Sequence, residues 1–278
     1  MIMIRKGRIG MKKGLSLFLV VLLSFLMLAG CTSNTQTETT SETPGTQTEE
    51  IQTTTTLRVG ALKGPTAMGM VELMAENEAQ ETATNAYEFT LMASPDEITP
   101  LLAKGELDIA AVPANLASVL YQNTNQGVSV LAINTLGVIY IVENGDTIHS
   151  VQDLKGKTIY ASGKGSTPEF GLYYILEENG LNPETDVQIE WKTEHAECVA
   201  ALEADPTGIA MLPQPFVTTA QMQNENLRIA LDLSAEWDTL QSGKENPSGM
   251  ITGVVIARND VITENPEAIA LFLEQYAA

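Results

Sequence analysis

The chain has 278 residues, 44% of them hydrophobic, and a formal net charge of −20 at pH 7. Five of its 15 basic residues lie within the first 13 positions, so the part from Cys31 onward holds ten basic against 35 acidic residues, a net charge of −25. A surface this acidic repels nucleic acid and anionic headgroups, which argues against both as partners. Cys198 is the one cysteine after Cys31, so the folded part has no internal disulfide and needs a substantial hydrophobic core.

Residues 1–30 are predicted to be a lipoprotein signal peptide. A basic leader, with Met1 or Met11 as the start, precedes an apolar run over residues 15–29. A membrane span needs about 20 apolar residues, so this run has the length of a signal-peptide core rather than of a permanent helix. The sequence Leu28-Ala29-Gly30-Cys31 resembles the lipobox of bacterial lipoproteins. That resemblance implies lipidation of Cys31 and anchoring on the extracytoplasmic face of the cell membrane; an ordinary signal peptide or a short membrane anchor is the alternative.

Residues 31–56 are predicted to be a disordered tether. Twelve of the 25 residues from Thr32 to Thr56 are threonine, and Ile51 is the one sizeable apolar side chain. Such a segment buries too little apolar surface to offset the entropy lost on ordering. It is long enough to hold a folded domain away from a membrane.

From residue 57 the chain alternates strand and helix patterns. Strands are predicted at 57–62, 87–92, 107–112 and 128–134, with a helix carrying Met70 and Met74, another starting at the capping box Ser94-Pro95-Asp96-Glu97, and a third running to Tyr121. These elements predict a first lobe over residues 57–138, and an extended run at 138–142 follows it.

The alternation then restarts. Strands are predicted at 158–161, 187–191, 208–212 and 228–231, helices at 167–179, 194–204 and 214–224, a polar loop at 234–248, and a last strand at 250–257 before a helix beginning near Asn265. The expected fold is α/β, with a second lobe over 139–248 and a return to the first lobe over 249–278. Each lobe is expected to hold a mostly parallel sheet flanked by helices, with two hinge crossings between the lobes.

Several short motifs carry a family resemblance. The segment 151–159 (VQDLKGKTI) resembles one found in periplasmic-type binding proteins. It is followed by Gly165-Ser166, the run 180–183 (GLNP) and Pro213-Gln214-Pro215, and it is preceded by the run 105–110 (GELDIA). Together they resemble the nitrate, sulfonate, taurine and thiamine-precursor binding proteins of ABC importers. The resemblance implies a type II two-lobed fold, capture of a small organic or anionic solute, and delivery to a membrane permease by a monomeric protein. Family members continue past the helix near Asn265, so a C-terminal truncation is expected.

Ligands of open α/β sheets bind beyond the carboxyl ends of the strands, often at the helix N-termini that follow. The loops expected to line the cleft contribute the following candidate ligand-binding residues: Lys63, Gly64, Pro65, Thr66, Ser94, Asn115, Asn134, Thr135, Lys164, Ser166, Thr167, His195 and Gln214. Lys164 and the N–H groups near Ser166 favour an anion, whereas Glu169 is positioned to complete a capping box with Ser166 and Glu194 adds negative charge. An anionic, a neutral and a zwitterionic solute therefore all stay open.

Catalysis is not expected. The sequence around Lys164 lacks the spacing of a phosphate-binding loop, and two histidines are too few for a His-rich metal cluster, so neither a cofactor nor a metal is predicted. His195 and Cys198 lie three residues apart on a predicted helix, but the stripe of Cys198, Val199 and Leu202 indicates a core-facing thiol. A catalytic relative on the same fold, of the thiamine-precursor synthesis type, and a secreted ligand-sensing domain are the alternatives.

Overall fold

The structure, a computed structural model, describes residues 55–82 and 85–278. The predicted signal peptide, the lipidation site Cys31 and the tether up to residue 54 lie outside the described residues. Within the described ranges, the search for a helix long and apolar enough to cross a membrane finds none.

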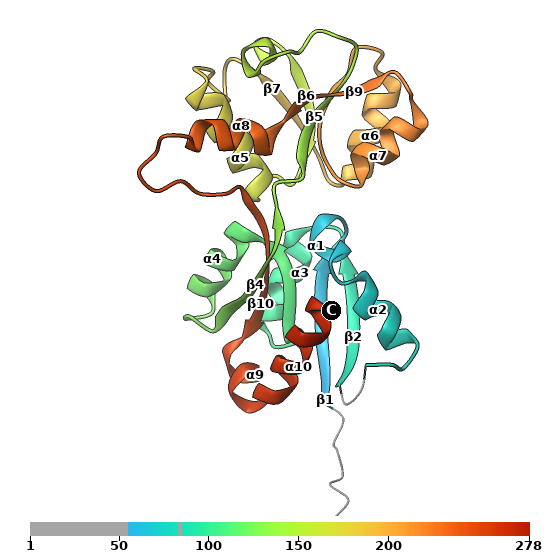
Figure 1. The fold of residues 1–278 in the computed structure, drawn as a ribbon, viewed down its shortest axis with the longest axis vertical. Helices are drawn as coiled ribbons and strands as arrows, with labels where there is room; N and C mark the ends of the chain where they lie inside the picture. Colours follow the sequence, from blue (N-terminus) through green and yellow to red (C-terminus); the bar gives the residue numbers. More distant parts are fainter. Residues whose placement is uncertain (1–54, 83–84) are drawn as a thin grey trace, which may run out of the picture. The chain divides into compact units, whose positions relative to one another are not determined.

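The predicted strands form two five-stranded sheets, which confirms the α/β class (Figure 1). The first sheet has the order β2-β1-β3-β10-β4. Its strands are β1 (Thr55–Leu62), β2 (Asn85–Met92), β3 (Ile109–Pro113), β4 (Val128–Leu136) and β10 (Ile251–Arg258). Its helices are α1 (Pro65–Met68), α2 (Val71–Glu78), α3 (Pro95–Ala103), α4 (Ala114–Asn123), α9 (Asn259–Glu264) and α10 (Pro266–Ala277).

The second sheet repeats this arrangement with the order β7-β6-β8-β5-β9. Its strands are β5 (Ile139–Asn144), β6 (Thr158–Ser162), β7 (Gln188–Lys192), β8 (Ile209–Pro213) and β9 (Leu227–Asp232). Its helices are the 3₁₀ helix η1 (Val151–Leu154), α5 (Thr167–Glu178), α6 (His195–Ala204), α7 (Phe216–Gln223) and α8 (Leu233–Gln241).

Each sheet contains one strand that arrives from the other half of the fold. β10 is antiparallel to β3 and β4, and β5 is antiparallel to β8 and β9, while the other observed pairings are parallel. β5 follows β4 directly, and β10 follows α8, so these two strands bring the chain across between the sheets, as the two predicted crossings require. The result is the expected two-lobed architecture.

Both faces of each sheet are covered by apolar side chains. Along β5, Ile139 and Ile141 pack into one core cluster with α5 and α8, while Val142 packs into another with α6 and α7. Figure 1 shows these two helix pairs on opposite sides of the sheet. A strand buried on both faces is apolar at successive positions rather than at alternate ones, which explains the continuous apolar run of β5.

The capping box predicted at the start of α3 is confirmed, with Pro95 in the first turn. The polar loop predicted over residues 234–248 is wrong in its first half, because α8 runs from Leu233 to Gln241. The carboxylate of Asp232 caps this helix by accepting hydrogen bonds from the N–H groups of Ser234 and Ala235. Leu233, Trp237 and Leu240 turn toward the core, and this i, i+4, i+7 spacing is a helix pattern.

Candidate solute-binding site

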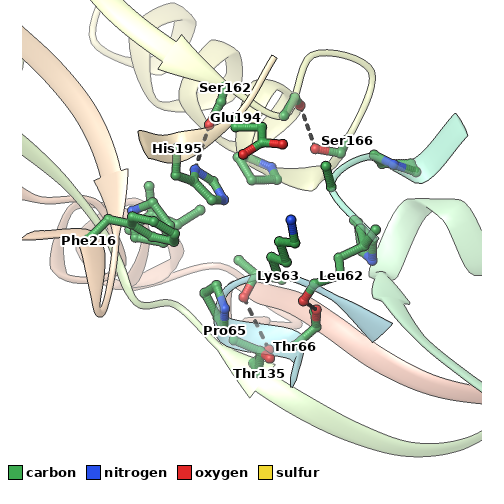
Figure 2. Close-up of a pocket in the computed structure, with 18 of the residues that line it drawn as sticks. Leu62, Lys63, Pro65, Thr66, Thr135, Ser162, Ser166, Glu194, His195 and Phe216 are labelled. Carbon is green, nitrogen blue, oxygen red and sulfur yellow. Dashed lines mark hydrogen bonds between the residues drawn. The ribbon is translucent and has the colours of Figure 1, made fainter. Parts of the chain in front are cut away.

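A cavity of about 280 Å³ lies where the strands of both sheets end. β1, β2 and β3 of the first sheet end beside it, and so do β6, β7 and β8 of the second. The lining residues are Leu62, Lys63, Pro65, Thr66, Ala93, Pro95, Pro113, Thr135, Val138, Ile139, Ser162, Gly163, Ser166, Pro168, Thr193, Glu194, His195, Ala196, Pro213, Phe216 and Thr252 (Figure 2). The cavity therefore lies at the strand ends where ligands of open α/β sheets bind.

The framework of the cavity is largely apolar and rigid. Five of its lining residues are prolines, at positions 65, 95, 113, 168 and 213. Leu62, Val138, Ile139 and the ring of Phe216 add further apolar surface. A cavity of this composition buries the body of a small organic molecule and leaves orientation to a few polar groups.

One cation and one carboxylate face each other in this apolar setting. Figure 2 shows the side chain of Lys63 extending from the end of β1 toward Glu194 and His195 on the other side of the cavity. Glu194 is the N-cap of α6, in a capping box with Glu197. A carboxylate has about four lone-pair positions, so capping a helix leaves Glu194 able to accept from a solute.

Six hydroxyl groups add to the polar surface, and four of them already donate their proton within the protein. Thr66 donates to the carbonyl of Leu62 (3.1 Å), and Ser166 donates to the carbonyl of Gly163. Thr252 donates to the carbonyls of Thr135 (3.3 Å) and Gly137 (3.1 Å). The hydroxyl of Thr135 donates to Oδ1 of Asn134 at 3.1 Å.

His195 is held against the cavity wall by two neighbours. Its Nδ1 lies 2.5 Å from the hydroxyl of Ser162, and its ring centroid lies 4.9 Å from that of Phe216. Desolvation by burial lowers the pKa of His195 to about 4. The imidazole is therefore neutral at pH 7 and adds no positive charge to the cavity.

Six of the predicted residues line this cavity: Lys63, Pro65, Thr66, Thr135, Ser166 and His195. The other seven lie outside its lining: Gly64, Ser94, Asn115, Asn134, Lys164, Thr167 and Gln214. Lys164 is exposed, and the capping box predicted between Ser166 and Glu169 is replaced by a hydrogen bond of 2.5 Å from the N–H of Gly165 to Oε2 of Glu169.

Most of the remaining predicted residues hold structure around the cavity. The amide of Asn134 donates to the carbonyl of Thr66 (3.0 Å), and Gln214 accepts from the hydroxyl of Thr218 (3.0 Å). Asn115 donates through Nδ2 to the carbonyl of Gly165 (2.9 Å) and accepts from the hydroxyl of Thr167 (3.1 Å). Asn115 and Thr167 thus join the start of α4 to the start of α5.

Sequence reasoning did not include Ser162, Phe216 or Thr252 among the candidates. Ser162 ends β6 and Phe216 begins α7. Ligands of open α/β sheets bind at such strand ends and helix starts, so this principle was sufficient to predict both residues. Thr252 lies on β10, and its place depends on the insertion of that strand between β3 and β4. Trp191, on β7, packs against the core of the second sheet and is not part of the lining.

The thiol of Cys198 is fully buried on α6 among Val199, Leu202 and neighbouring strand residues. Burial is the main cause that raises its pKa to about 11. A thiolate is the reactive form of cysteine, so this thiol is poorly suited to nucleophilic chemistry at neutral pH. Among the described residues, groups of three or more His, Cys, Asp or Glu side chains suited to hold a metal ion are also absent.

Comparison with known protein families decides the class. Residues 68–275 match the family described as the phosphonate periplasmic substrate-binding protein of ABC transporters. The chain belongs to this family. It is an extracytoplasmic substrate-binding protein, which takes up a small solute and delivers it to a membrane permease. A search of curated proteins found no match.

Solved structures with the same fold support this assignment at the level of architecture. The periplasmic aliphatic sulphonate-binding protein of Escherichia coli aligns with a TM-score of 0.60 at 19% identity, covering 80% of this chain and 71% of that one. The ligand-binding component of an ABC-type import system from Staphylococcus aureus gives 0.63 at 13% identity, covering 80% and 72%. The periplasmic nitrate-binding protein of Synechocystis gives 0.58 at 16%, covering 80% and 60%.

Proposed function

We propose that the cavity at the strand ends is where this protein captures its solute for import. The observation that carries the proposal is that residues following strands of both sheets line one cavity. A solute held there contacts both halves of the fold at once. Binding that involves both halves favours their closed arrangement, which is the form that a permease can distinguish from the empty protein.

The two halves that close on the solute are proposed to be residues 57–138 together with 249–278, and residues 139–248. The chain passes between them at the β4–β5 connection and at the segment before β10. Asn115 and Thr167 provide direct hydrogen bonds between the halves beside the cavity. These bonds form only when the starts of α4 and α5 are close together, so they act as a clasp for the closed form.

The proposed role is binding without turnover. A buried thiol of raised pKa and a neutral imidazole, separated from each other by the hydroxyl of Ser162, do not make an activated nucleophile. Sulfonates, nitrate and thiamine-precursor-like pyrimidines are the first solutes to examine, because similar structures carry the names of sulphonate- and nitrate-binding proteins.

The protein is further proposed to act as a monomer held at the membrane surface by a lipid on Cys31. The lipobox-like sequence and the threonine-rich segment that follows it support this arrangement. A tether between the lipid and the folded part keeps the cavity within reach of the permease.

The cavity assignment is tested by blocking it. Ala196 is exposed and lines the cavity at the start of α6, so Ala196→Trp fills solute space without disturbing the core. A thermal-shift screen of the full chain with sulfonates, nitrate, phosphonates, pyrimidines and amino compounds identifies a binder, and calorimetry measures its affinity. We expect Ala196→Trp to weaken that binder by about tenfold or more, since overfilling a packed site costs about 1–3 kcal/mol.

The matched control is Ala200→Trp, one turn further along α6. Ala200 is equally exposed but does not line the cavity. Its variant should bind within about twofold of the parent. Equal affinities of both variants and the parent for a confirmed solute would place the binding site elsewhere.

A further inference from the structure

The N–H groups that precede three helices at the cavity edge are already bound by glutamates of the chain itself. At α3 the N–H groups of Ala93 and Ser94 donate to Glu97 (3.1 and 3.0 Å). At α5 the N–H of Gly165 donates to Glu169 (2.5 Å). At α6 the N–H groups of Thr193 and Glu194 donate to Glu197 (2.7 and 3.3 Å). Helix N-termini attract anions because their N–H groups are free and their dipole is positive. Here a built-in carboxylate lies at each of the three N-termini and offsets part of that attraction.

Prolines remove further donors from the same edge. Pro65, Pro95 and Pro168 occupy the first turn of α1, α3 and α5, and all three line the cavity. Proline has no backbone N–H, so these positions offer an oxyanion nothing to accept from. Pro113 and Pro213 have the same effect at the ends of β3 and β8.

Four of the six hydroxyl groups of the cavity present lone pairs rather than protons. Thr66, Thr135, Ser166 and Thr252 each donate their one hydroxyl proton to an acceptor within the protein. A hydroxyl has one donor and two acceptor positions, so each of these groups can still accept a hydrogen bond. A solute that donates hydrogen bonds satisfies them, and a solute that only accepts does not.

The charges agree with this preference. Among the described residues that line the cavity, Lys63 is the one lysine or arginine, and Glu194 is the one acid. The remaining polar side chains of the lining are the neutral ring of His195 and six hydroxyl groups, four of which act as acceptors toward a solute. An ammonium group is matched by Glu194 and the hydroxyl lone pairs, whereas an oxyanion has Lys63 as its one charged partner.

We propose that the solute is a small organic ammonium compound with an apolar body, whose nitrogen is recognised by Glu194. Any anionic group on the same molecule is secondary and lies near Lys63. This inference rests on the proposed function, since it assumes that the cavity is the binding site. Under this inference, the affinity for a solute depends on whether the solute carries an amine rather than on which anionic group it carries.

Pairs of probes that are alike except for the amine provide a direct test of the ammonium inference. The pairs are 2-aminoethylphosphonate with ethylphosphonate, 3-aminopropanesulfonate with propanesulfonate, and 6-aminohexanoate with hexanoate. Calorimetry on the full chain measures each affinity. We expect the amine-bearing member of at least one pair to bind about tenfold or more tightly than its partner, because a charge-assisted hydrogen bond is roughly twice as strong as a neutral one.

Glu194→Gln keeps the shape and the capping oxygen of the side chain but removes its charge. This variant should abolish the difference within the pair, because the Coulomb attraction on the ammonium is lost. The amine-free member, which is an anion that Glu194 repels, should bind at least as tightly as to the parent. Glu190→Gln is the matched control, because Glu190 pairs with Lys192 (3.3 Å) outside the cavity lining. Thermal unfolding of both variants confirms that they are folded.

The outcomes separate the two proposals. Tighter binding of the amine-free members, or an unchanged preference in Glu194→Gln, overturns the ammonium inference. If such binding is still blocked by Ala196→Trp, the cavity keeps its role in solute capture. Loss of sensitivity to Ala196→Trp overturns the cavity assignment, and absence of binding by all six probes at millimolar concentration counts against the ammonium inference.

Discussion

At the scale of single residues, His195 is a titratable group whose pKa is strongly shifted by its surroundings. Burial lowers its pKa from 6.5 to about 4, and its ring is fixed between Ser162 and Phe216. A neutral imidazole in this place adds no charge to the cavity wall. The same feature couples the stability of the fold to pH.

His195 is expected to make the folded protein less stable in acid. The folded state holds the imidazole neutral, so its contribution is complete above about pH 6.5 and is lost as the pH falls from there through about 4. At about pH 4.5 the loss is about 2 kcal/mol, because the unfolded state binds a proton that the folded state resists. His195→Gln should therefore reduce the fall in the free energy of unfolding between pH 7 and 4.5, measured by urea titration.

The control for this prediction is His149→Gln, because the side chain of His149 is 64% exposed. This variant should keep the pH slope of the parent. A slope for His195→Gln equal to that of the parent would mean that the imidazole takes up its proton without cost in the folded state.

The two lysines proposed for the site show where residue-level prediction stops. Lys63 and Lys164 both follow a strand in sequence, yet Lys63 lines the cavity and Lys164 is exposed. Lys164 lies between Gly163 (φ +79°) and Gly165 (φ +76°), and it is exposed although Gly163 and Ser166 line the cavity. Composition indicates that a loop lies at the site, but the side-chain direction depends on dihedral angles that the sequence does not reveal.

At the scale of elements, the buried end of β5 is organised around one carboxylate. Glu143 is 2% exposed and accepts hydrogen bonds from the N–H groups of Thr147 (2.9 Å) and Ile148 (3.1 Å), and from the guanidinium of Arg228. Burial alone raises the pKa of Glu143, but the hydrogen bonds from Ile148 and Thr147 and the charge of Arg228 outweigh it and lower the pKa. The carboxylate thus fixes the turn after β5 and ties it to β9.

Glu143→Gln is expected to destabilise the fold by about 2–4 kcal/mol, since it breaks charge-assisted bonds and leaves the guanidinium of Arg228 with the exposed Asp146 (3.2 Å) as its acidic partner. The amide nitrogen of glutamine also cannot accept from the backbone N–H groups of the turn. Chemical unfolding followed by circular dichroism measures the loss. Glu190→Gln, which breaks a partly exposed pair with Lys192, should cost less than about 1 kcal/mol; equal costs would show that the turn does not need the charge.

Local patterns predicted the strands and most of the helices, because periodicity and capping signals are contained in a few neighbouring residues. The missed helix α8 had such signals too, in Asp232 and in the spacing of Leu233, Trp237 and Leu240. The order of strands within each sheet had no comparable signal. Insertion of β10 between β3 and β4 depends on contacts between residues more than 100 positions apart, such as Val255 with Ala132.

At the scale of the whole molecule, the site depends on both crossings of the chain. Val138 and Ile139 at the first crossing and Thr252 after the second line the same cavity. The hydroxyl of Thr252 donates to the carbonyls of Thr135 and Gly137, so it links the two crossings. If the cavity captures the solute as proposed, the segments that move during closure and the segments that contact the solute are in part the same, which couples binding to closure.

The proposed membrane attachment also belongs to this scale, and it rests on Cys31. If the lipobox-like sequence is processed, the mature protein begins at Cys31 and carries a lipid on its sulfur. Two or more acyl chains give stable anchoring, since each buried CH₂ contributes about 0.8 kcal/mol.

We expect protein made in a bacterial host to partition into the detergent phase, with intact mass showing a modified cysteine as the first residue. Cys31→Ser should move the protein to the aqueous phase while leaving solute affinity unchanged, because the cavity is built from residues 62–252. A parent protein whose mature chain starts at another residue and carries an unmodified thiol would contradict lipid anchoring and leave the tether without this role.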